Sequence, residues 1–269
     1  MEIKKQLSDG TVYRIYGEGP TCILLHGFAE DGHIWDQQVA VLMKEFSCMV
    51  IDMPGTGDSA SSFEKYKDLS VESAADLVLK IIDQEHLGKV TLLGHSMGGY
   101  ITLAFAEKYS ERLNGFGLIH STAFADSEEK VQNRKKSATF MKEHGTRLFL
   151  EQLYPNLYGE LFKKEHYDII EMQIKASEIY QAEVLIQYYE MMMVRPDRTN
   201  VLRASQKPVL FIIGAEDKTV NLSDSMAQCH LPQESHIHIL EKAGHMGMKE
   251  EAEKTTIAIR EFLSYVNGN

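Results

Sequence analysis

Two kinds of hydrophobic pattern alternate along most of the chain. Short, nearly continuous apolar runs are typical of strands that are buried on both faces of a sheet. Such runs predict strands at Thr11–Tyr16, Thr21–Leu25, Cys48–Ile51, Val90–Leu93, Gly115–Ile119, Val209–Ile213 and His236–Leu240. Segments with apolar residues at helical spacing lie between these runs or follow the last one, at Trp35–Met43, Val71–Glu85, Met97–Tyr109 and Lys249–Val266. The alternation predicts a doubly wound α/β core, in which helices cover both faces of a mostly parallel sheet.

The alternation breaks after the fifth predicted strand. The following segment has no convincing strand pattern, favours helices by its composition, and is rich in aromatic side chains and methionines. We therefore predict a core formed by residues 1–120 and 203–269, with residues 121–202 inserted as a helical cap. The large apolar side chains of the cap are consistent with an acyl pocket or with a core of the cap itself. At the end of the cap, Arg195–Arg198 is expected to form the exit hinge, and binding of a substrate carboxylate by an arginine there is the alternative.

Composition narrows the classes of protein that fit this pattern. The 269 residues are 43% apolar and 25% charged, which is typical of a globular protein with a substantial core. A formal charge of -11 disfavours a nucleic-acid partner, because the phosphates would be repelled. No apolar run approaches the ~20 residues of a spanning helix, and the first residues do not resemble a signal peptide. The three cysteines are widely spaced and suit buried thiols in a reducing compartment. Together these features lead us to expect a cytoplasmic protein that does not bind membranes.

Three residues with complementary chemistry each follow a predicted strand. Ser96 lies within the GxSxG pattern of Gly94–Gly98, whose outer glycines permit a sharp turn between strand and helix. Asp217 follows the strand at Val209–Ile213, and His245 follows the last strand. A serine hydroxyl becomes a nucleophile when an imidazole accepts its proton and a carboxylate orients that imidazole. Because the carboxyl ends of parallel strands meet at one edge of a sheet, we expect Ser96, His245 and Asp217 to form a catalytic triad there.

These motifs, taken in order, resemble those of the cap-bearing α/β hydrolases. The similarity runs from about Thr11 to the C-terminus, and it is carried by Leu24–Phe28 with Trp35, Asp52–Ser59, Gly94–Gly99, Gly214–Asp217 and Gly244–His245. The resemblance implies an eight-stranded sheet and a serine hydrolase that needs no cofactor. It also implies that the backbone N–H of Phe28 forms part of an oxyanion hole. The other expected donor is the N–H of Met97, because N–H groups at the start of a helix are free and lie at the positive end of its dipole.

Other polar residues compete for roles in this site. Glu216 is the alternative to Asp217 as the acid, since the two are adjacent in the chain. His236 and His238 share one face of a strand at a spacing that suits a metal, but no third ligand accompanies them, so we predict no metal site. The remaining histidines near the motifs are expected to have structural roles, within the core or at the border of the pocket; they are His26, His33, His95 and His120.

The leading functional prediction is an enzyme that hydrolyses a small to medium, partly apolar ester through an acyl-enzyme. C–C bond hydrolysis, enol-lactone hydrolysis and cofactor-free, haloperoxidase-like perhydrolysis are alternatives, because proteins similar to this one use the same triad for those reactions. Ser96 disfavours a dehalogenase or an epoxide hydrolase, since those relatives have aspartate at that position. The expected partner is the small-molecule substrate. The non-enzymatic alternative is a ligand receptor that keeps the fold and has slow turnover.

Overall fold

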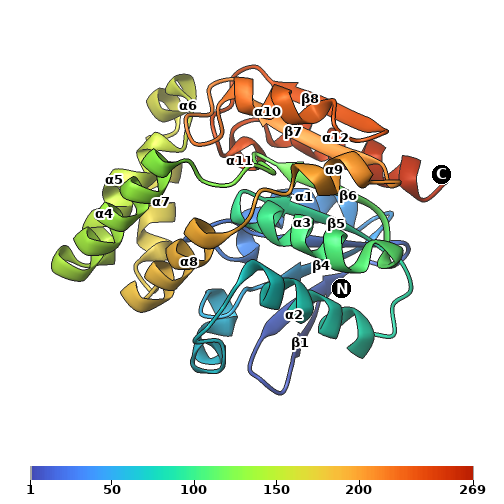
Figure 1. Ribbon diagram of the computed structural model, residues 1–269, viewed down its shortest axis with the longest axis horizontal. Helices are drawn as coiled ribbons and strands as arrows, with labels where there is room; N and C mark the ends of the chain where they lie inside the picture. Colours follow the sequence, from blue (N-terminus) through green and yellow to red (C-terminus); the bar gives the residue numbers. More distant parts are fainter. Residues whose placement is uncertain (1, 269) are drawn as a thin grey trace.

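The computed structural model describes residues 2–268 and contains one eight-stranded sheet (Figure 1). Its strands are β1 Glu2–Gln6, β2 Val12–Tyr16, β3 Thr21–Leu25, β4 Ser47–Ile51, β5 Val90–His95, β6 Leu113–Ile119, β7 Val209–Gly214 and β8 Ser235–Leu240. They are arranged in the order β1-β2-β4-β3-β5-β6-β7-β8. Neighbours from β4 onward pair in parallel, whereas β2 pairs antiparallel with both β1 and β4. The predicted fold class, a doubly wound α/β fold with a mostly parallel sheet, is confirmed.

Strand β1 has no counterpart among the apolar runs, although the family resemblance implies an eighth strand. Its sequence, EIKKQ, is mostly polar, and its side chains are exposed or half-buried. The strand lies at the edge of the sheet and pairs only with β2. Charged side chains on an edge strand oppose pairing with another chain. An edge position therefore needs no apolar run, and this is why the hydrophobic pattern does not predict β1.

Helices cover both faces of the sheet, as the complete burial of β5 and β7 requires (Figure 1). Helix α1 (Asp36–Leu42) packs against α12 (Ala252–Val266), and α2 (Val71–Gln84) packs against α3 (Met97–Tyr109). The other helices of this part of the chain are η1 Gly32–Trp35, η2 Gly57–Lys65, η3 Ser110–Arg112, α10 Leu222–Cys229 and α11 Gly247–Glu250.

The end of the chain differs from the single helix predicted over Lys249–Val266. It forms two helices, α11 and α12, because Glu251 between them has a non-helical backbone with φ -129° and ψ 54°. The carboxylate of Glu251 accepts a hydrogen bond from the N–H of Lys242 at 3.0 Å. This hydrogen bond joins Glu251 to the loop before α11 and forms only in the folded protein. The helical spacing of apolar residues therefore does not predict the break between α11 and α12.

Between β6 and β7 the structure contains helices and no strand. These helices are α4 Glu128–His144, α5 Thr146–Leu153, η4 Tyr154–Asn156, α6 Glu160–Glu165, α7 Tyr167–Ser177, α8 Ala182–Val194 and α9 Thr199–Ala204. Figure 1 shows α4, α5, α7 and α8 together at one side of the molecule. Helix α9 crosses the predicted boundary at residue 202 and contacts α3. The division into a core and a cap at residues 121–202 stays a prediction.

Buried contacts tie the two ends of this helical segment together. Asp126 Oδ1 lies 2.8 Å from Nη1 of Arg195, and the N–H of Arg198 donates to the carbonyl of Ala123 at 2.7 Å. The guanidinium of Arg195 also stacks over the ring of Tyr100, 3.9 Å from its centroid. These contacts occupy Arg195, which the sequence makes a candidate for binding a substrate carboxylate.

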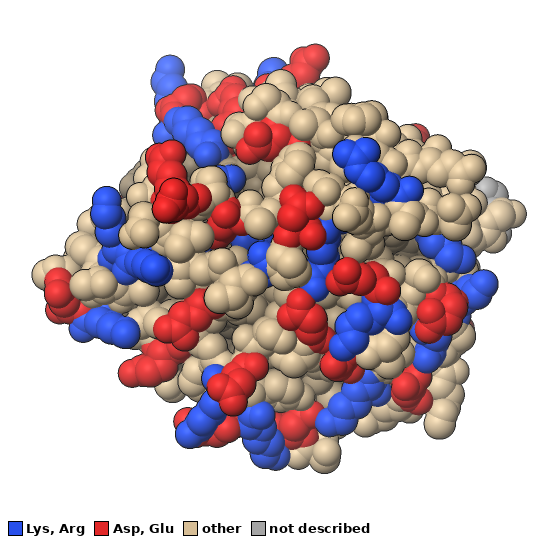
Figure 2. Space-filling view, viewed as in Figure 1, with Lys and Arg blue, Asp and Glu red and all other residues tan. Residues whose placement is uncertain are grey.

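Surface charge and the cysteines follow the pattern expected from composition. On the face drawn in Figure 2, Lys and Arg side chains lie among Asp and Glu side chains. Within residues 2–268, no helix combines the length and the apolar character that crossing a bilayer requires.

All three cysteines are buried and free, and burial raises the pKa of Cys48 to about 12. Such thiols have little thiolate character at neutral pH, so they suit packing rather than nucleophilic chemistry.

Candidate active site

Ser96 lies in a tight turn between the carboxyl end of β5 and the first residue of α3. Its φ is 50° and its ψ is -114°, a conformation that is strained for a residue with a side chain. Two glycines make the turn possible. A Cβ on Gly94 would lie 2.2 Å from the backbone of Gly98, and a Cβ on Gly98 would lie 2.7 Å from the carbonyl oxygens of Leu25 and His26. The outer glycines of the GxSxG pattern thus have the steric role expected from the sequence.

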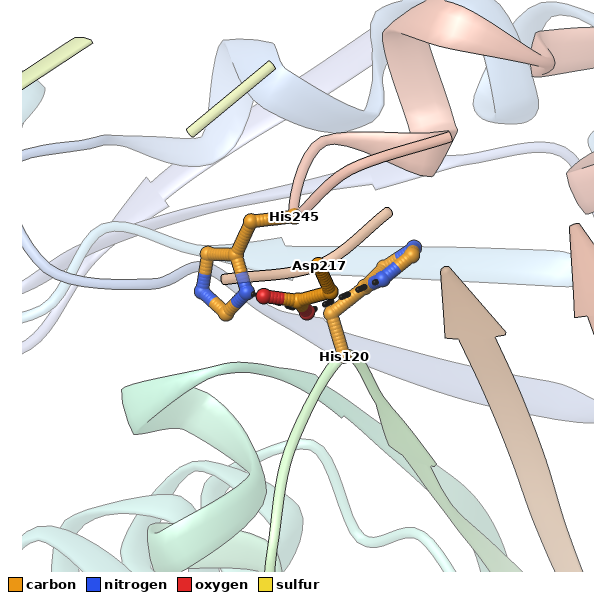
Figure 3. Close-up of side chains that lie close together, drawn as sticks. All are labelled: His120, Asp217 and His245. Atoms are coloured by element: carbon orange, nitrogen blue, oxygen red, sulfur yellow. Dashed lines mark hydrogen bonds and ion pairs between the residues drawn. The ribbon is translucent and has the colours of Figure 1, made fainter. Parts of the chain in front are cut away.

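The side chains of Ser96, His245 and Asp217 form a hydrogen-bonded series. Ser96 Oγ lies 2.9 Å from Nε2 of His245, and Nδ1 of His245 lies 2.7 Å from Oδ2 of Asp217. The other carboxylate oxygen of Asp217 accepts hydrogen bonds from the N–H groups of Thr219 and Val220, at 2.8 and 2.9 Å. These bonds fix the carboxylate with Oδ2 toward the imidazole (Figure 3). All three side chains are buried, and exclusion of water strengthens the bonds between them.

The protonation state of the series follows from these contacts. Burial opposes ionisation of Asp217, but the charge and hydrogen bond of His245, together with the nearby ring of His120, hold the pKa of Asp217 well below its usual range. The carboxylate therefore accepts the Nδ1 proton of His245. This leaves the lone pair of Nε2 directed at the hydroxyl of Ser96, as proton transfer from that hydroxyl requires.

His120 lies on the opposite side of Asp217 from His245 (Figure 3). Its Nδ1 is 3.6 Å from Oδ2 of Asp217, and its Nε2 accepts a hydrogen bond from the N–H of Gly247 at 3.2 Å. Burial lowers the pKa of His120 to about 4, so the ring is neutral at physiological pH. Its one proton is then on Nδ1, directed toward Asp217. The contact between His120 and the carboxylate is not predicted by the sequence analysis.

The same three residues offer ligand atoms that lie within 4.8 Å of one another, a spacing that a metal ion can bridge. A metal would need the Nδ1 lone pairs of both His120 and His245. Both atoms carry protons, because Asp217 accepts from His245, and Gly247 donates to the other nitrogen of His120. The donor set therefore fits a hydrogen bond from His245 to Asp217 and a longer contact from His120 rather than metal ligation.

The two expected oxyanion-hole donors lie next to the strands that flank the serine turn. Phe28 follows β3, which neighbours β5 in the sheet, and Met97 is the first residue of α3. Within residues 2–268, the N–H groups of Phe28 and Met97 have no protein acceptor. Both are therefore available to a ligand oxygen. The ring of Phe28 stacks on that of Tyr189, with centroids 4.3 Å apart.

The remaining candidates have partners of their own. Glu216, the alternative acid, accepts a hydrogen bond from the N–H of Glu160 at 2.8 Å. His26 accepts one from the N–H of Met53 at 3.0 Å, in agreement with its expected structural role. The expectation that His33 is partly buried is wrong, because its side chain is exposed at the surface and lies 3.1 Å from the carboxylate of Asp36. Of the two histidines on β8, His236 has Nε2 3.0 Å from a carboxylate oxygen of Glu234 in the adjacent loop.

Glu250 joins the loop of His245 to the helical segment. One of its carboxylate oxygens accepts hydrogen bonds from the N–H groups of Gly244 and Met246, at 2.9 and 3.0 Å. The other oxygen accepts from the N–H of Gly159 at 2.7 Å. Glu250 thus holds the loop on both sides of His245. Sequence reasoning misses this residue because its partners are backbone groups, which carry no signal of their own in the sequence.

Replacing Glu250 with glutamine is expected to lower the free energy of unfolding. A glutamine amide would face at least one backbone N–H that now donates to a carboxylate, and such an unsatisfied donor costs about 1 to 3 kcal/mol. Urea denaturation measures the change. Glu253→Gln is the matched control, because it makes the same substitution at an exposed residue of the next helix, α12. Equal urea midpoints for the two variants would contradict the role of Glu250 in holding the loop.

Comparison with known proteins agrees with this fold. The model of the α/β hydrolase fold family matches residues 20–252, which include Ser96, Asp217 and His245. The chain belongs to the α/β-hydrolase family. The family resemblance of the sequence is thereby confirmed, and the chain is a hydrolase.

Three similar proteins align with different fractions of this chain. An esterase from Thermogutta terrifontis is 29% identical, with a TM-score of 0.87 and coverage of 99% of both chains. The proposed 2-succinyl-6-hydroxy-2,4-cyclohexadiene-1-carboxylate synthase of Bacillus subtilis is 25% identical over 271 residues, or 97% of each protein. Chloroplastic protein PHYLLO from Arabidopsis thaliana is 28% identical over 179 residues, which are 62% of the hydrolase and only 10% of PHYLLO. The chain thus spans a small part of PHYLLO but nearly all of the other two relatives.

Proposed function

We propose that this hydrolase cleaves a small to medium, partly apolar carboxylic ester through an acyl-enzyme. The observation that carries the proposal is the series of contacts from Ser96 Oγ to His245 at 2.9 Å and from His245 to Asp217 at 2.7 Å. Two backbone N–H groups without protein acceptors lie in the adjoining segments. Similarity to an esterase over almost the whole chain supports the same class of reaction.

In the first half of the reaction, Ser96 Oγ attacks the carbonyl carbon of the ester, and Nε2 of His245 accepts the hydroxyl proton. Asp217 keeps the Nδ1 proton in place and stabilises the imidazolium that forms. The C–O bond of the ester then breaks as His245 donates its Nε2 proton to the leaving alcohol. In the second half, water attacks the acyl carbon and gives a proton to His245. That proton returns to Ser96 as the carboxylic acid leaves.

We assign stabilisation of the oxyanion to the N–H groups of Phe28 and Met97. Negative charge develops on the carbonyl oxygen when Ser96 attacks, and preorganised N–H donors stabilise it without reorganisation. Removal of one such donor raises the barrier by about 3 to 4 kcal/mol in comparable enzymes. The Met97 donor gains further from its position at the start of α3, where the helix dipole is positive.

Aromatic rings beside the Phe28 N–H support a partly apolar substrate. Phe28 and Tyr189 are stacked, and Phe149 contacts them edge-on with centroid distances of 6.3 and 6.0 Å. Aromatic walls of this kind bind the apolar groups of small ligands. Two of the three rings come from the segment between β6 and β7. We therefore propose that residues 121–202 act as a cap that forms part of the substrate site.

A fluorophosphonate probe and a panel of aryl esters of increasing acyl length test the proposal. We expect covalent labelling of the Ser96 peptide, read by mass spectrometry, and repeated turnover of at least one ester. The dependence of kcat/KM on acyl length then gives the size of the pocket. The same panel includes a lactone and a vinylogous diketone. Faster turnover of either compound than of every ester would identify lactone hydrolysis or C–C bond hydrolysis as the reaction instead. Labelling of Ser96 without repeated turnover of any of these compounds would favour the ligand-receptor alternative.

A further inference from the structure

A buried acid and a buried histidine lie in contact beneath the serine turn and have no part in the chemistry described above. They are Glu30, in the loop after β3, and His95, the residue before Ser96. Their side chains are 2% and 1% exposed, and Oε2 of Glu30 lies 2.9 Å from Nδ1 of His95. Both residues are thus removed from water and depend on each other for hydrogen bonds.

The neighbours of this pair favour a charged imidazolium beside a carboxylate. Oε2 of Glu30 also accepts a hydrogen bond from the N–H of Gly27 at 2.7 Å. On the far side of the ring, Nε2 of His95 lies 3.0 Å from the carbonyl oxygen of His245. A carbonyl only accepts, so Nε2 carries a proton. A carboxylate oxygen is the stronger acceptor for the two N–H groups that converge on Oε2, so Nδ1 carries a proton as well.

These contacts join the three segments that carry the proposed chemistry. Gly27 precedes the N–H of Phe28, His95 precedes the nucleophile, and the third contact is to the backbone of His245 itself. The fit is close, since a Cβ on Gly27 would lie 2.8 Å from Nδ1 of His95. The rings of His95 and His245 have centroids 5.0 Å apart. A change at the pair therefore reaches the nucleophile, the base and an oxyanion donor together.

We propose that Glu30 and His95 form a buried ion pair that positions the oxyanion loop, Ser96 and His245 relative to one another. Both are positioning residues, because neither touches the reacting atoms. The inference rests on the proposed function for its effect on catalysis, whereas the ion pair itself is independent of it. It gives a role to two residues that the mechanism leaves unused.

The titration of both groups is consistent with the charged pair. Burial alone would lower the pKa of His95, but the charge and hydrogen bond of Glu30 raise that pKa above its usual value. Burial alone would raise the pKa of Glu30, but the charge and hydrogen bond of His95 lower that pKa below its usual value. Other titratable groups that act on the pair or are acted on by it are His26, His120, His245, Tyr154, Tyr158, Tyr180 and Asp217.

These directions determine how the pair contributes to stability as pH changes. The contribution of His95 is complete below its ordinary pKa of 6.5 and is lost as pH rises through its raised value in the folded protein. The contribution of Glu30 is complete above its ordinary pKa of 4.5 and is lost as pH falls through its lowered value in the folded protein. The pair therefore stabilises the fold most between those two ordinary values.

Proton–nitrogen correlation spectra of the histidine rings test the ion pair directly. In the wild-type protein we expect His95 to carry protons on both ring nitrogens at neutral pH, where an ordinary histidine is mostly neutral. The signal is assigned by its loss in His95→Gln. Glu30→Gln is expected to remove the doubly protonated ring while the other histidine signals persist. A His95 ring with a single proton at neutral pH in the wild type would overturn the inference, whatever the activity of the enzyme.

Steady-state kinetics test the positioning role. Glu30→Gln is expected to lower kcat by about 10- to 100-fold with a smaller change in KM, because a small misplacement of reacting groups has effects of this size. Glu30→Asp keeps the charge and should recover part of the loss. Glu234→Gln is the matched control, since it removes the acid of a Glu–His pair that has a similar contact, 3.0 Å, but is only half-buried. Its kcat should equal that of the wild type.

The two proposals fail in different ways. Absence of ester turnover in the wild type would refute the proposed function and leave the spectra as the test of the ion pair. Wild-type kcat in Glu30→Gln would refute the positioning role and leave the proposed function intact. Urea midpoints separate positioning from general loss of structure. The difference between wild type and Glu30→Gln should be largest near pH 5.5, between the two ordinary pKa values, and should shrink as pH rises.

Discussion

Replacing Ser96 with alanine is expected to lower kcat for the preferred ester by about a million-fold, the loss seen when the nucleophile of a comparable serine hydrolase is removed. The substitution deletes the attacking oxygen and leaves the N–H donors and the substrate site in place. Residual catalysis over the uncatalysed reaction should therefore remain. Steady-state rates with purified protein, together with the loss of fluorophosphonate labelling, measure the effect.

Two further measurements make the Ser96 result specific. Ser223→Ala, which changes an exposed serine of α10, should hydrolyse the ester at the wild-type rate. The urea midpoint of Ser96→Ala should stay close to that of the wild type, because alanine at a φ of 50° is as strained as serine. More than a tenth of the wild-type rate in Ser96→Ala would show that another group is the nucleophile.

Replacing Asp217 with asparagine is expected to lower kcat by about ten-thousand-fold. The N–H groups of Thr219 and Val220 both donate to Oδ1, so the amide of asparagine must keep its oxygen there and turn its NH2 group toward His245. That group donates to Nδ1 and forces the ring proton onto Nε2. With Nε2 protonated, His245 cannot accept the proton of Ser96. The variant should keep its fold while losing turnover.

Glu216→Gln is the matched control for this prediction. It changes the neighbouring acid in the same way, but Glu216 bonds to the N–H of Glu160 rather than to the imidazole. Its kcat should remain within about three-fold of the wild type, the range typical of small effects away from the reacting groups. A large loss in Glu216→Gln with little loss in Asp217→Asn would assign the acid to Glu216 instead.

Much of the fold is predicted by local signals in the sequence. The buried strands are apolar runs because helices cover both of their faces, and Gly94 and Gly98 mark the turn because any side chain there would collide with backbone. The order of Ser96, Asp217 and His245 after three such strands predicts that they meet at one edge of the sheet. Their contacts at 2.9 and 2.7 Å agree with that expectation, and their catalytic roles stay predictions for the variants above.

Features without a local signal are not predicted. The polar edge strand β1 has no apolar run, because its side chains are not buried. The break at Glu251 and the three hydrogen bonds of Glu250 depend on loops that come together only in the folded chain. His120 resembles any other histidine until its ring is seen beside Asp217. Each of these depends on partners that the chain brings together only on folding.

The sequence by itself determined the class of fold, the family and the residues proposed for the chemistry, because hydrophobic period and turn glycines act over a few neighbouring positions. The tertiary structure alone decided how those residues are supported. Glu30 and His95 are 65 positions apart, and His95 and the carbonyl of His245 are 150 apart. Hydrogen bonds across such separations depend on the packing of the whole sheet, and no pattern in a short window of residues reports them.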